Sequence, residues 1–216
     1  SRARFTMDDD YKKAVEEAFL KYYNKGLIYQ GERVINWSKR CQTSLSDLEI
    51  EYEEEKGKLY FIKYPFKDEP LKYITVATSR PETMLGDTAA AVNPGDERYK
   101  NFIKGMLILP IINREIPVIA DDSIDKDFGT GAVKVTPNHS IVDSEIADRH
   151  KLPRVTIINQ FGKMTGEAGK EFEGLSSKDA RDKVIIKLQE LNLLEKKEEY
   201  VHLVSKCYRC NSVVEP

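Results

Sequence analysis

Apolar residues along this chain fall into many short runs that are separated by turn-forming residues. Runs rich in Val, Ile, Leu, Ala and Tyr are typical of strands. We predict strands at 73–77, 88–92, 106–112, 116–120, 132–135, 155–158 and 200–204. Short strands at this spacing, with Gly, Pro and Asn between them, favour a β-barrel or a strongly curved sheet.

Two further strands are predicted before these runs. Segments 49–53 and 58–64 flank the Glu-Glu-Lys-Gly sequence at 54–57, which is typical of a hairpin turn. The stretch 27–37 is predicted to be extended as well.

Helical spacing of apolar residues is confined to three segments, at 6–25, 140–150 and about 176–191. Thr6 with Asp9 opens the first segment as a capping box, and Ser140 with Asp143 opens the second. Gly26 follows the first segment, as glycine often does at a helix end. Few helices and many strands predict the α+β class, as a β-barrel-like domain with peripheral helices.

The composition permits one sizeable core and excludes several functional classes. Of the 216 residues, 40% are hydrophobic and 32% are charged, and the net charge is −2. A nucleic-acid partner would therefore have to meet a local basic patch rather than a basic field. No long apolar run, signal peptide or disulfide framework is present, so we expect a cytoplasmic protein without a membrane partner. The abrupt ends lead us to expect a piece of a larger protein.

A first candidate site follows the strand at 73–77. Thr78, Ser79 and Thr83 place three hydroxyls there, and hydroxyls can hold a ribose hydroxyl or a water because they both donate and accept. Pro81 biases Arg80 to an extended backbone. The Arg80 guanidinium is suited to a phosphate or a terminal carboxylate. An ordinary loop with capping hydroxyls is the alternative interpretation.

A second candidate site lies around the strand at 132–135. The glycines in 129–131 permit a tight turn close to a ligand, and Lys134 and Thr136 alternate with valines and so share one face. Asp143, in the first turn of the next helix, is favoured as an ion and suits a substrate ammonium group. The alternative is that Asp143 only completes the capping box with Ser140.

Neither site contains a strong nucleophile beside a base. This combination suits recognition of an aminoacyl ester and positioning of a water, rather than covalent catalysis.

The two sites together resemble the editing domain inserted in valyl-tRNA synthetases, class I enzymes of the isoleucyl/valyl/leucyl group. Most valyl enzymes carry Thr-Thr-Arg-Pro-Glu-Thr-Met-Leu-Gly-Asp-Thr-Ala where this chain has 78–89, and only Ser79 differs. The flanks also resemble the valyl enzyme, so the likeness covers nearly the whole chain. It implies three parts: a helix and linking strands at 1–47, the editing domain at 48–204, and a return with a Cys knuckle at 205–216.

The resemblance implies post-transfer editing, the hydrolysis of the ester in threonyl-tRNA(Val). The partners would be the 3′ acceptor end of tRNA(Val) carrying threonine and the remainder of the synthetase chain. The implied residues for water, ester and ammonium are Thr78, Ser79, Lys134, Thr136 and Asp143. The implied substrate-binding residues are Arg80, Glu82, Thr83, His139 and Ser140. No cofactor is implied for editing, and the absence of a His-Ile-Gly-His-like or Lys-Met-Ser-Lys-Ser-like stretch excludes aminoacylation by this piece.

Two positions of the second site leave questions open. Valyl enzymes usually carry Asp where this chain has Ser140, and that Asp is thought to sense the threonine hydroxyl. Ser140 can hydrogen-bond the same hydroxyl only as a neutral and weaker partner, so we expect weaker discrimination of threonine. His139 is either a pocket residue or a histidine satisfied by local backbone.

The cysteines indicate a degenerate metal site. Cys207 and Cys210 have the CxxC spacing of a zinc knuckle, and Cys41 lies far away in sequence. Some valyl enzymes have four cysteines in this arrangement, and Ser38 replaces the first of them here. A three-cysteine zinc site and an empty site both remain open.

Two alternative functions are retained. One is an editing domain of the isoleucyl or leucyl type, although isoleucyl enzymes typically have Pro-Trp-Thr where this chain has Pro-Glu-Thr at 81–83. The other is a tRNA-docking module whose catalytic site has decayed. Hydrolysis of threonyl-tRNA(Val) distinguishes both from the main hypothesis.

Overall fold

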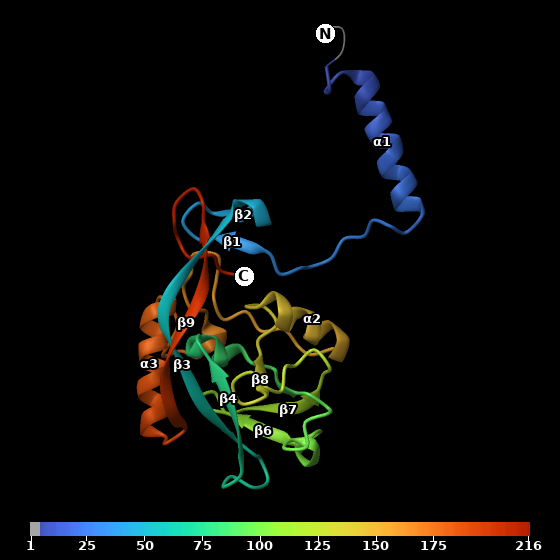
Figure 1. Ribbon diagram of the computed structural model, residues 1–216. Coiled ribbons are helices and arrows are strands. Elements are labelled where there is room, and N and C mark those ends of the chain that lie inside the picture. Colours follow the sequence, from blue (N-terminus) through green and yellow to red (C-terminus); the bar gives the residue numbers. More distant parts are fainter. Residues whose placement is uncertain (1–4) are drawn as a thin grey trace. The chain divides into compact units, whose positions relative to one another are not determined.

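The computed structural model describes residues 5–216, which divide into two compact units between residues 33 and 34 (Figure 1). Helix α1 (Asp9–Asn24) is the one regular element described in the first unit. The Asp8 carboxylate accepts a hydrogen bond from the Tyr11 backbone N–H at 3.1 Å and caps it. The predicted cap at Thr6 was therefore wrong by two residues, because the aspartate reaches the free N–H groups of the first turn.

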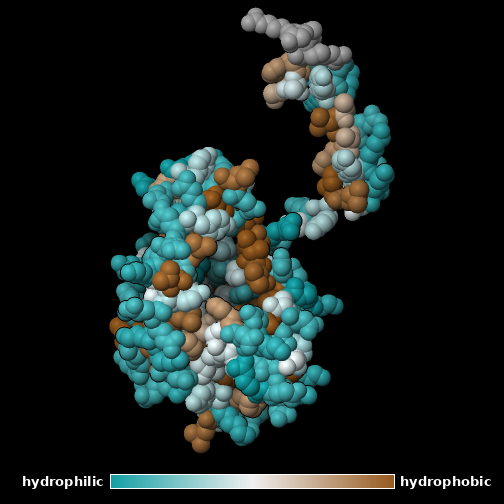
Figure 2. All heavy atoms as spheres, viewed as in Figure 1, coloured by the Kyte–Doolittle hydropathy of each residue, from teal (hydrophilic) through white to brown (hydrophobic). Residues whose placement is uncertain are grey.

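The end of α1 agrees with the prediction, since Gly26 has a φ of +69° and follows the last turn. None of the α1 side chains is buried. Figure 2 shows the apolar ones gathered along one flank of the helix.

The second unit contains three sheets and two α-helices, which confirms the α+β class (Figure 1). The sheets consist of β1 (Asn36–Ser38) and β2 (Thr43–Leu45); β4 (Tyr73–Thr78), β3 (Ile50–Pro65) and β9 (Leu194–Cys207); and β6 (Met106–Leu109), β7 (Arg114–Ala120), β5 (Ala89–Val92) and β8 (Ala132–Val135). All pairs are antiparallel except β5 with β7. In residues 5–216 the sheets remain separate and do not close into a barrel.

The predicted hairpin at 54–57 was wrong, because these residues lie inside the single strand β3. The distant strand β9 pairs with β3 along this stretch, with Glu54 opposite Leu203 and Gly57 opposite Tyr200. A Cβ at Gly57 would lie 2.6 Å from the His202 ring. This glycine therefore permits a close cross-strand approach rather than a turn.

Two helices pack beside the sheets in this unit (Figure 1). Helix α2 (Ile141–His150) begins at Ser140, as predicted, and follows β8. Helix α3 (Ser177–Glu190) begins at Ser176 and buries Ala180, Val184 and Leu188 in the main core. That core also contains residues from β3 to β7. The predicted strand at 155–158 makes only an isolated bridge from Ile158 to Met164.

No helix in the described part of the chain is long and apolar enough to cross a membrane.

Candidate functional site

The two sequence-predicted sites lie side by side in the fold. Strand β4 ends at Thr78 and continues into the short 3-10 helix η2 (Pro81–Gly86), while β8 leads into α2. The backbone N–H of Thr88 donates to the carbonyl of Val135 at 2.9 Å. This bond joins the end of the first segment to the end of β8.

Lys134 and Thr136 meet in a buried polar chain. The Lys134 Nζ donates to the Thr136 Oγ1 at 2.5 Å, so the side chains of Lys134 in β8 and of Thr136 directly after it point to the same side, as predicted. The Thr136 Oγ1 in turn donates to the Asp87 Oδ1 at 2.5 Å, and the Lys134 ammonium lies 3.4 Å from the same oxygen. The Tyr64 hydroxyl donates to the Asp87 Oδ2 at 2.7 Å.

Burial dominates the electrostatics of Asp87, which has no exposed surface. Removal from water raises the pKa of its carboxyl to about 6, although Lys134, Thr136 and Tyr64 favour the ionised form. The same burial, together with the Asp87 charge, holds the pKa of Tyr64 well above its usual value. Tyr64 is therefore a donor and not an anion at neutral pH.

Asp143 is also buried, at the start of α2. Its backbone N–H donates to the Ser140 Oγ at 3.2 Å, which confirms Ser140 as the N-cap of α2. Its carboxylate accepts the backbone N–H of Thr136 at 2.8 Å and links α2 to β8. Burial raises the pKa of Asp143, against the opposing effects of Lys134 and this hydrogen bond. The sequence-based prediction had considered only the helix dipole, which favours the ionised carboxylate.

Arg80 and Glu82 belong to an ion-pair network in which the carboxylates are buried and the arginines are half-buried. The Arg80 Nε donates to Glu82 at 3.2 Å, and its Nη2 donates to Glu215 at 2.5 Å. Arg181 from α3 donates to both oxygens of Glu82 at 2.8 and 2.9 Å. The network ties η2 to α3 and to the C-terminal return, and the neighbouring carboxylates raise the pKa of Arg80 despite burial. Substrate contact by Arg80 and Glu82 remains a prediction.

The hydroxyls of the first site pack around the Arg80 backbone. Thr78 Oγ1 accepts the Arg80 N–H at 3.0 Å, and Thr83 Oγ1 donates to the Arg80 carbonyl at 2.9 Å. Both threonines are buried, whereas Ser79 is half-buried. Thr78 and Thr83 therefore bond the loop backbone, as the alternative interpretation expected. The substrate roles of all three hydroxyls stay predictions.

His139 is held as a neutral ring. Its Nε2 accepts the backbone N–H of Ile157 at 2.9 Å, and burial lowers its pKa to about 3, with smaller contributions from Arg80 and Lys134. The proton of the neutral ring must then lie on Nδ1, which is buried and has no partner among the described residues. The backbone of a distant segment, and not local backbone, thus satisfies one of the two nitrogens. Pocket contact by His139 remains a prediction.

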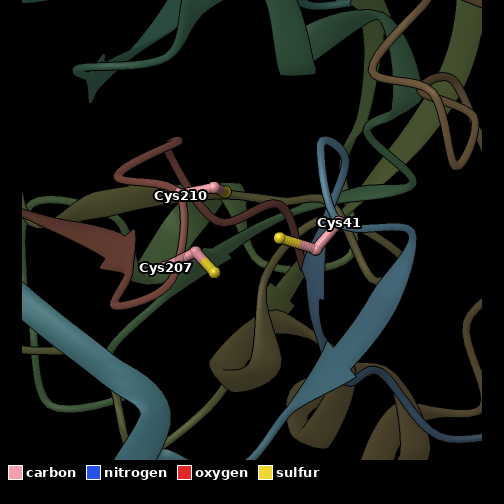
Figure 3. Close-up of side chains that lie close together, drawn as sticks. All are labelled: Cys41, Cys207 and Cys210. Atoms are coloured by element: carbon pink, nitrogen blue, oxygen red, sulfur yellow. The ribbon is translucent and has the colours of Figure 1, made fainter.

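The three cysteines come together at the far end of the β3–β9 ribbon. Cys41 lies on the loop between β1 and β2, Cys207 ends β9, and Cys210 follows in the next turn, with their sulfur atoms within 4.8 Å of one another (Figure 3). This cluster could hold a metal ion. Ser38 occupies the place of a fourth ligand, since its Oγ lies 3.6 Å from the Cys210 sulfur and accepts the Cys41 N–H at 3.2 Å.

A neutral hydroxyl is a poor substitute for a zinc-bound thiolate. The donor set therefore fits zinc at three positions of four. The Ser212 hydroxyl, together with Ser38, lowers the pKa of the Cys210 thiol to about 6.

Sequence reasoning did not assign roles to Tyr64, Asp87, Arg181 and Glu215. Asp87 stood at the end of the first motif, and its position after a buried segment was the only local signal. Tyr64 and Arg181 carried no signal, because their partners are distant in the chain.

Comparison with known proteins gives the family. The model of class I tRNA synthetases (I, L, M and V) matches residues 1–209. This chain belongs to that family. A valine–tRNA ligase from Thermotoga maritima is 52% identical over 216 residues, which cover all of this chain and 25% of the relative. A valine–tRNA ligase from Carboxydothermus hydrogenoformans is 52% identical over 215 residues and 24% of its length. The chain thus spans about a quarter of these relatives.

A solved synthetase structure shares the fold. It is the leucyl-tRNA synthetase of Agrobacterium radiobacter K84 agnB2, in a ternary complex with tRNA and LeuAMS. The superposition has a TM-score of 0.52 at 16% identity and covers 95% of this chain and 36% of the other. This synthetase-family fold agrees with the mixed sheets and peripheral helices described above.

Proposed function

We propose that this part of the synthetase performs post-transfer editing, by hydrolysing the ester of threonyl-tRNA(Val). The observation that carries the proposal is the buried group of Lys134, Thr136 and Asp143 beside the hydroxyl segment 78–83. It combines acceptors for a substrate ammonium with polar groups suited to an ester. The partners would be the 3′ acceptor end of tRNA(Val) and the rest of the synthetase chain, in the cytoplasm.

The proposed selectivity follows from the limits of a valine pocket. Such a pocket cannot strongly reject threonine, which is nearly isosteric, and valyl-tRNA synthetase is itself the standard example of this limit. A second site that requires a hydroxyl excludes valine, because buried polar groups would be left unpaired. Asp143 and Thr136 supply such groups in this chain.

The proposed reaction adds water to the ester carbonyl and breaks the bond to the ribose oxygen, which regains a proton. Asp87 is fully buried, and Asp143 is engaged by the Thr136 N–H. Because neither carboxylate is a free base, the adjacent ribose hydroxyl of the terminal adenosine would assist the proton transfer. Lys134, Thr136, Thr78 and Ser79 would orient the ester, ribose and water.

The decisive experiment incubates the purified chain with threonyl-tRNA(Val), valyl-tRNA(Val) and valyl-tRNA(Ile). We expect release of threonine above the uncatalysed rate and little release of valine from tRNA(Val). Hydrolysis of valyl-tRNA(Ile) alone would instead indicate an isoleucyl-type domain. Binding of tRNA without hydrolysis of any ester would indicate a docking module.

A further inference from the structure

Asp87 joins the two candidate sites from a position that a substrate cannot reach. It has no exposed surface, and its two carboxylate oxygens receive three side-chain donors. Thr136 and Lys134 meet Oδ1, and Tyr64 meets Oδ2. Arg114 additionally donates to the Asp87 backbone carbonyl at 3.2 Å, which anchors the main chain of this residue.

The donors and acceptors of this group leave a single arrangement of protons. An ammonium only donates and an ionised carboxylate only accepts. The Thr136 hydroxyl therefore accepts from Lys134 and must give its one proton to Asp87. One lone pair of the Thr136 oxygen remains, so this hydroxyl can meet a further ligand only as an acceptor.

We infer that Asp87 is the positioning residue that sets the polarity of the site, by fixing Thr136 as an acceptor and holding the Lys134 ammonium in place. This inference rests on the proposed function and deepens it. With Asp87 ionised, Thr136 and Asp143 both present acceptors, which select the donors of a substrate: its α-ammonium group and its side-chain hydroxyl. Valine lacks the second of these donors.

Protonation of Asp87 would reverse this arrangement. A protonated Oδ1 becomes a donor toward Thr136. The Thr136 hydroxyl then points its own proton away from Asp87, toward the side where the substrate's donors would bind. Lys134 also loses its nearest counter-charge. The charged and titratable groups facing Asp87 are Lys134 from β8, Asp143 from α2, Tyr64 from β3 and, at its backbone carbonyl, Arg114 from β7. Because the pKa of Asp87 lies at about 6, threonyl-ester hydrolysis should fall as the pH drops through that value.

The test measures kcat/KM for threonyl-tRNA(Val) from pH 5 to pH 8, corrected for uncatalysed hydrolysis, in the parent chain and in Asp87→Asn. The variant amide can still accept from Thr136 and donate to the Tyr64 oxygen, so the fold should persist. The amide keeps Thr136 as an acceptor but removes the charge that holds the Lys134 ammonium. We therefore expect at least a tenfold loss of kcat/KM at pH 7.5, and the decline in activity below about pH 6 should disappear because position 87 no longer titrates. Asp121→Asn is the control, since Asp121 is another buried carboxylate among side-chain donors, away from the candidate site. It should leave the decline in activity at low pH unchanged.

Tyr64→Phe keeps the inference testable if the first variant does not fold. Loss of the Tyr64 hydrogen bond removes one group that lowers the Asp87 pKa, so the midpoint of the decline in activity at low pH should move to higher pH. The inference is overturned if kcat/KM still declines below about pH 6 in Asp87→Asn, or if the midpoint of this decline does not move in Tyr64→Phe. A parent chain that hydrolyses no threonyl-tRNA(Val) at any pH refutes the proposed function instead, and the two failures are therefore distinguishable.

Discussion

At the scale of single residues, the second site depends on Asp143, whose carboxylate already accepts one hydrogen bond from the protein. Asp143 holds the Thr136 N–H with one oxygen, and its remaining capacity is what a substrate ammonium would use. This double duty means that charge and hydrogen bonding at Asp143 can be separated by mutation.

We predict that Asp143→Asn loses threonine recognition while the fold persists. The amide oxygen can still accept the Thr136 N–H, but the negative charge is gone. Hydrogen bonds to charged groups contribute about 1.5–3 kcal/mol, so kcat/KM for threonyl-tRNA(Val) should fall roughly ten- to a hundredfold. Asp143→Ala should lose recognition too, and its unpaired Thr136 N–H should cost about 1–3 kcal/mol of stability. Equal affinity of parent and Asn variant for a threonyl-adenosine analogue would show that the Asp143 carboxylate only joins α2 to the end of β8.

His139 leads to a prediction about pH and stability. Its folded pKa of about 3 lies below its ordinary value, so below about pH 6.5 the unfolded chain binds a proton that the folded chain does not. The stability contributed by His139 is present above about pH 6.5 and is lost as the pH falls. At pH 5 the loss should reach about 2 kcal/mol.

His139→Gln should remove this dependence, because glutamine does not titrate and its oxygen can accept the Ile157 N–H. Denaturant unfolding of parent and variant at pH 7 and pH 5 measures the difference. Identical pH dependence in the two proteins would show that His139 is readily protonated in the fold.

Position 140 leads to a prediction about selectivity. Ser140 caps α2 through the Asp143 N–H, and Asp is a comparable cap, so Ser140→Asp should not harm the helix. A charged acceptor should strengthen the bond to the threonine hydroxyl by about 1 kcal/mol, roughly fivefold in rate. The ratio of hydrolysis rates for threonyl and valyl esters should therefore rise. An unchanged ratio would mean that position 140 does not face the substrate.

At the scale of elements, the ends of the long β3–β9 ribbon bring the cysteine cluster together. Cys207 ends β9, and the β1–β2 hairpin supplies Cys41 and Ser38. Cys207 is also part of a small apolar cluster with Leu45, Ile50 and Val214, and Cys41 and Cys210 pack against that cluster. Packing thus maintains the geometry even with three thiols.

We predict less than one tightly held zinc per parent chain and stoichiometric zinc in Ser38→Cys. The added thiol completes the four-ligand set that structural zinc requires, and it comes from a buried position beside Cys210. Ser38→Ala is the control, because it removes the hydroxyl without adding a ligand. Elemental analysis after dialysis against a weak chelator measures the metal. Full zinc in the parent, lost in Cys207→Ser, would contradict the prediction.

At the scale of the whole molecule, the core and the candidate site lie within residues 34–216. The first unit contains α1, whose side chains are all outside a core. Stability therefore resides in the second unit.

We predict that residues 34–216 alone fold with the unfolding midpoint of the full chain and retain its threonyl-ester hydrolysis. Removal of 1–33 takes away no buried side chain of α1, and surface changes away from buried features usually alter stability by less than about 0.5 kcal/mol. Thermal unfolding and ester hydrolysis of the two proteins provide the comparison. A large drop in midpoint would reveal a stabilising contact made by the first unit.

The sequence by itself determined the features that depend on neighbouring residues. Strand β8, the caps of α2 and α3, and the helix end at Gly26 follow from local periodicity and capping chemistry. The family resemblance also rested on contiguous motifs, and the comparisons bear it out.

Only the tertiary structure decided what depends on partners far along the chain. The 54–57 segment has turn-like composition, yet β9 supplies a hydrogen-bond ladder that keeps it extended. Asp87 and Thr136 are 49 residues apart, and Arg80 and Glu215 are 135 apart. Local pattern cannot specify such pairs, because burial, and with it the raised pKa of Asp87, exists only once the sheets and α2 have packed together.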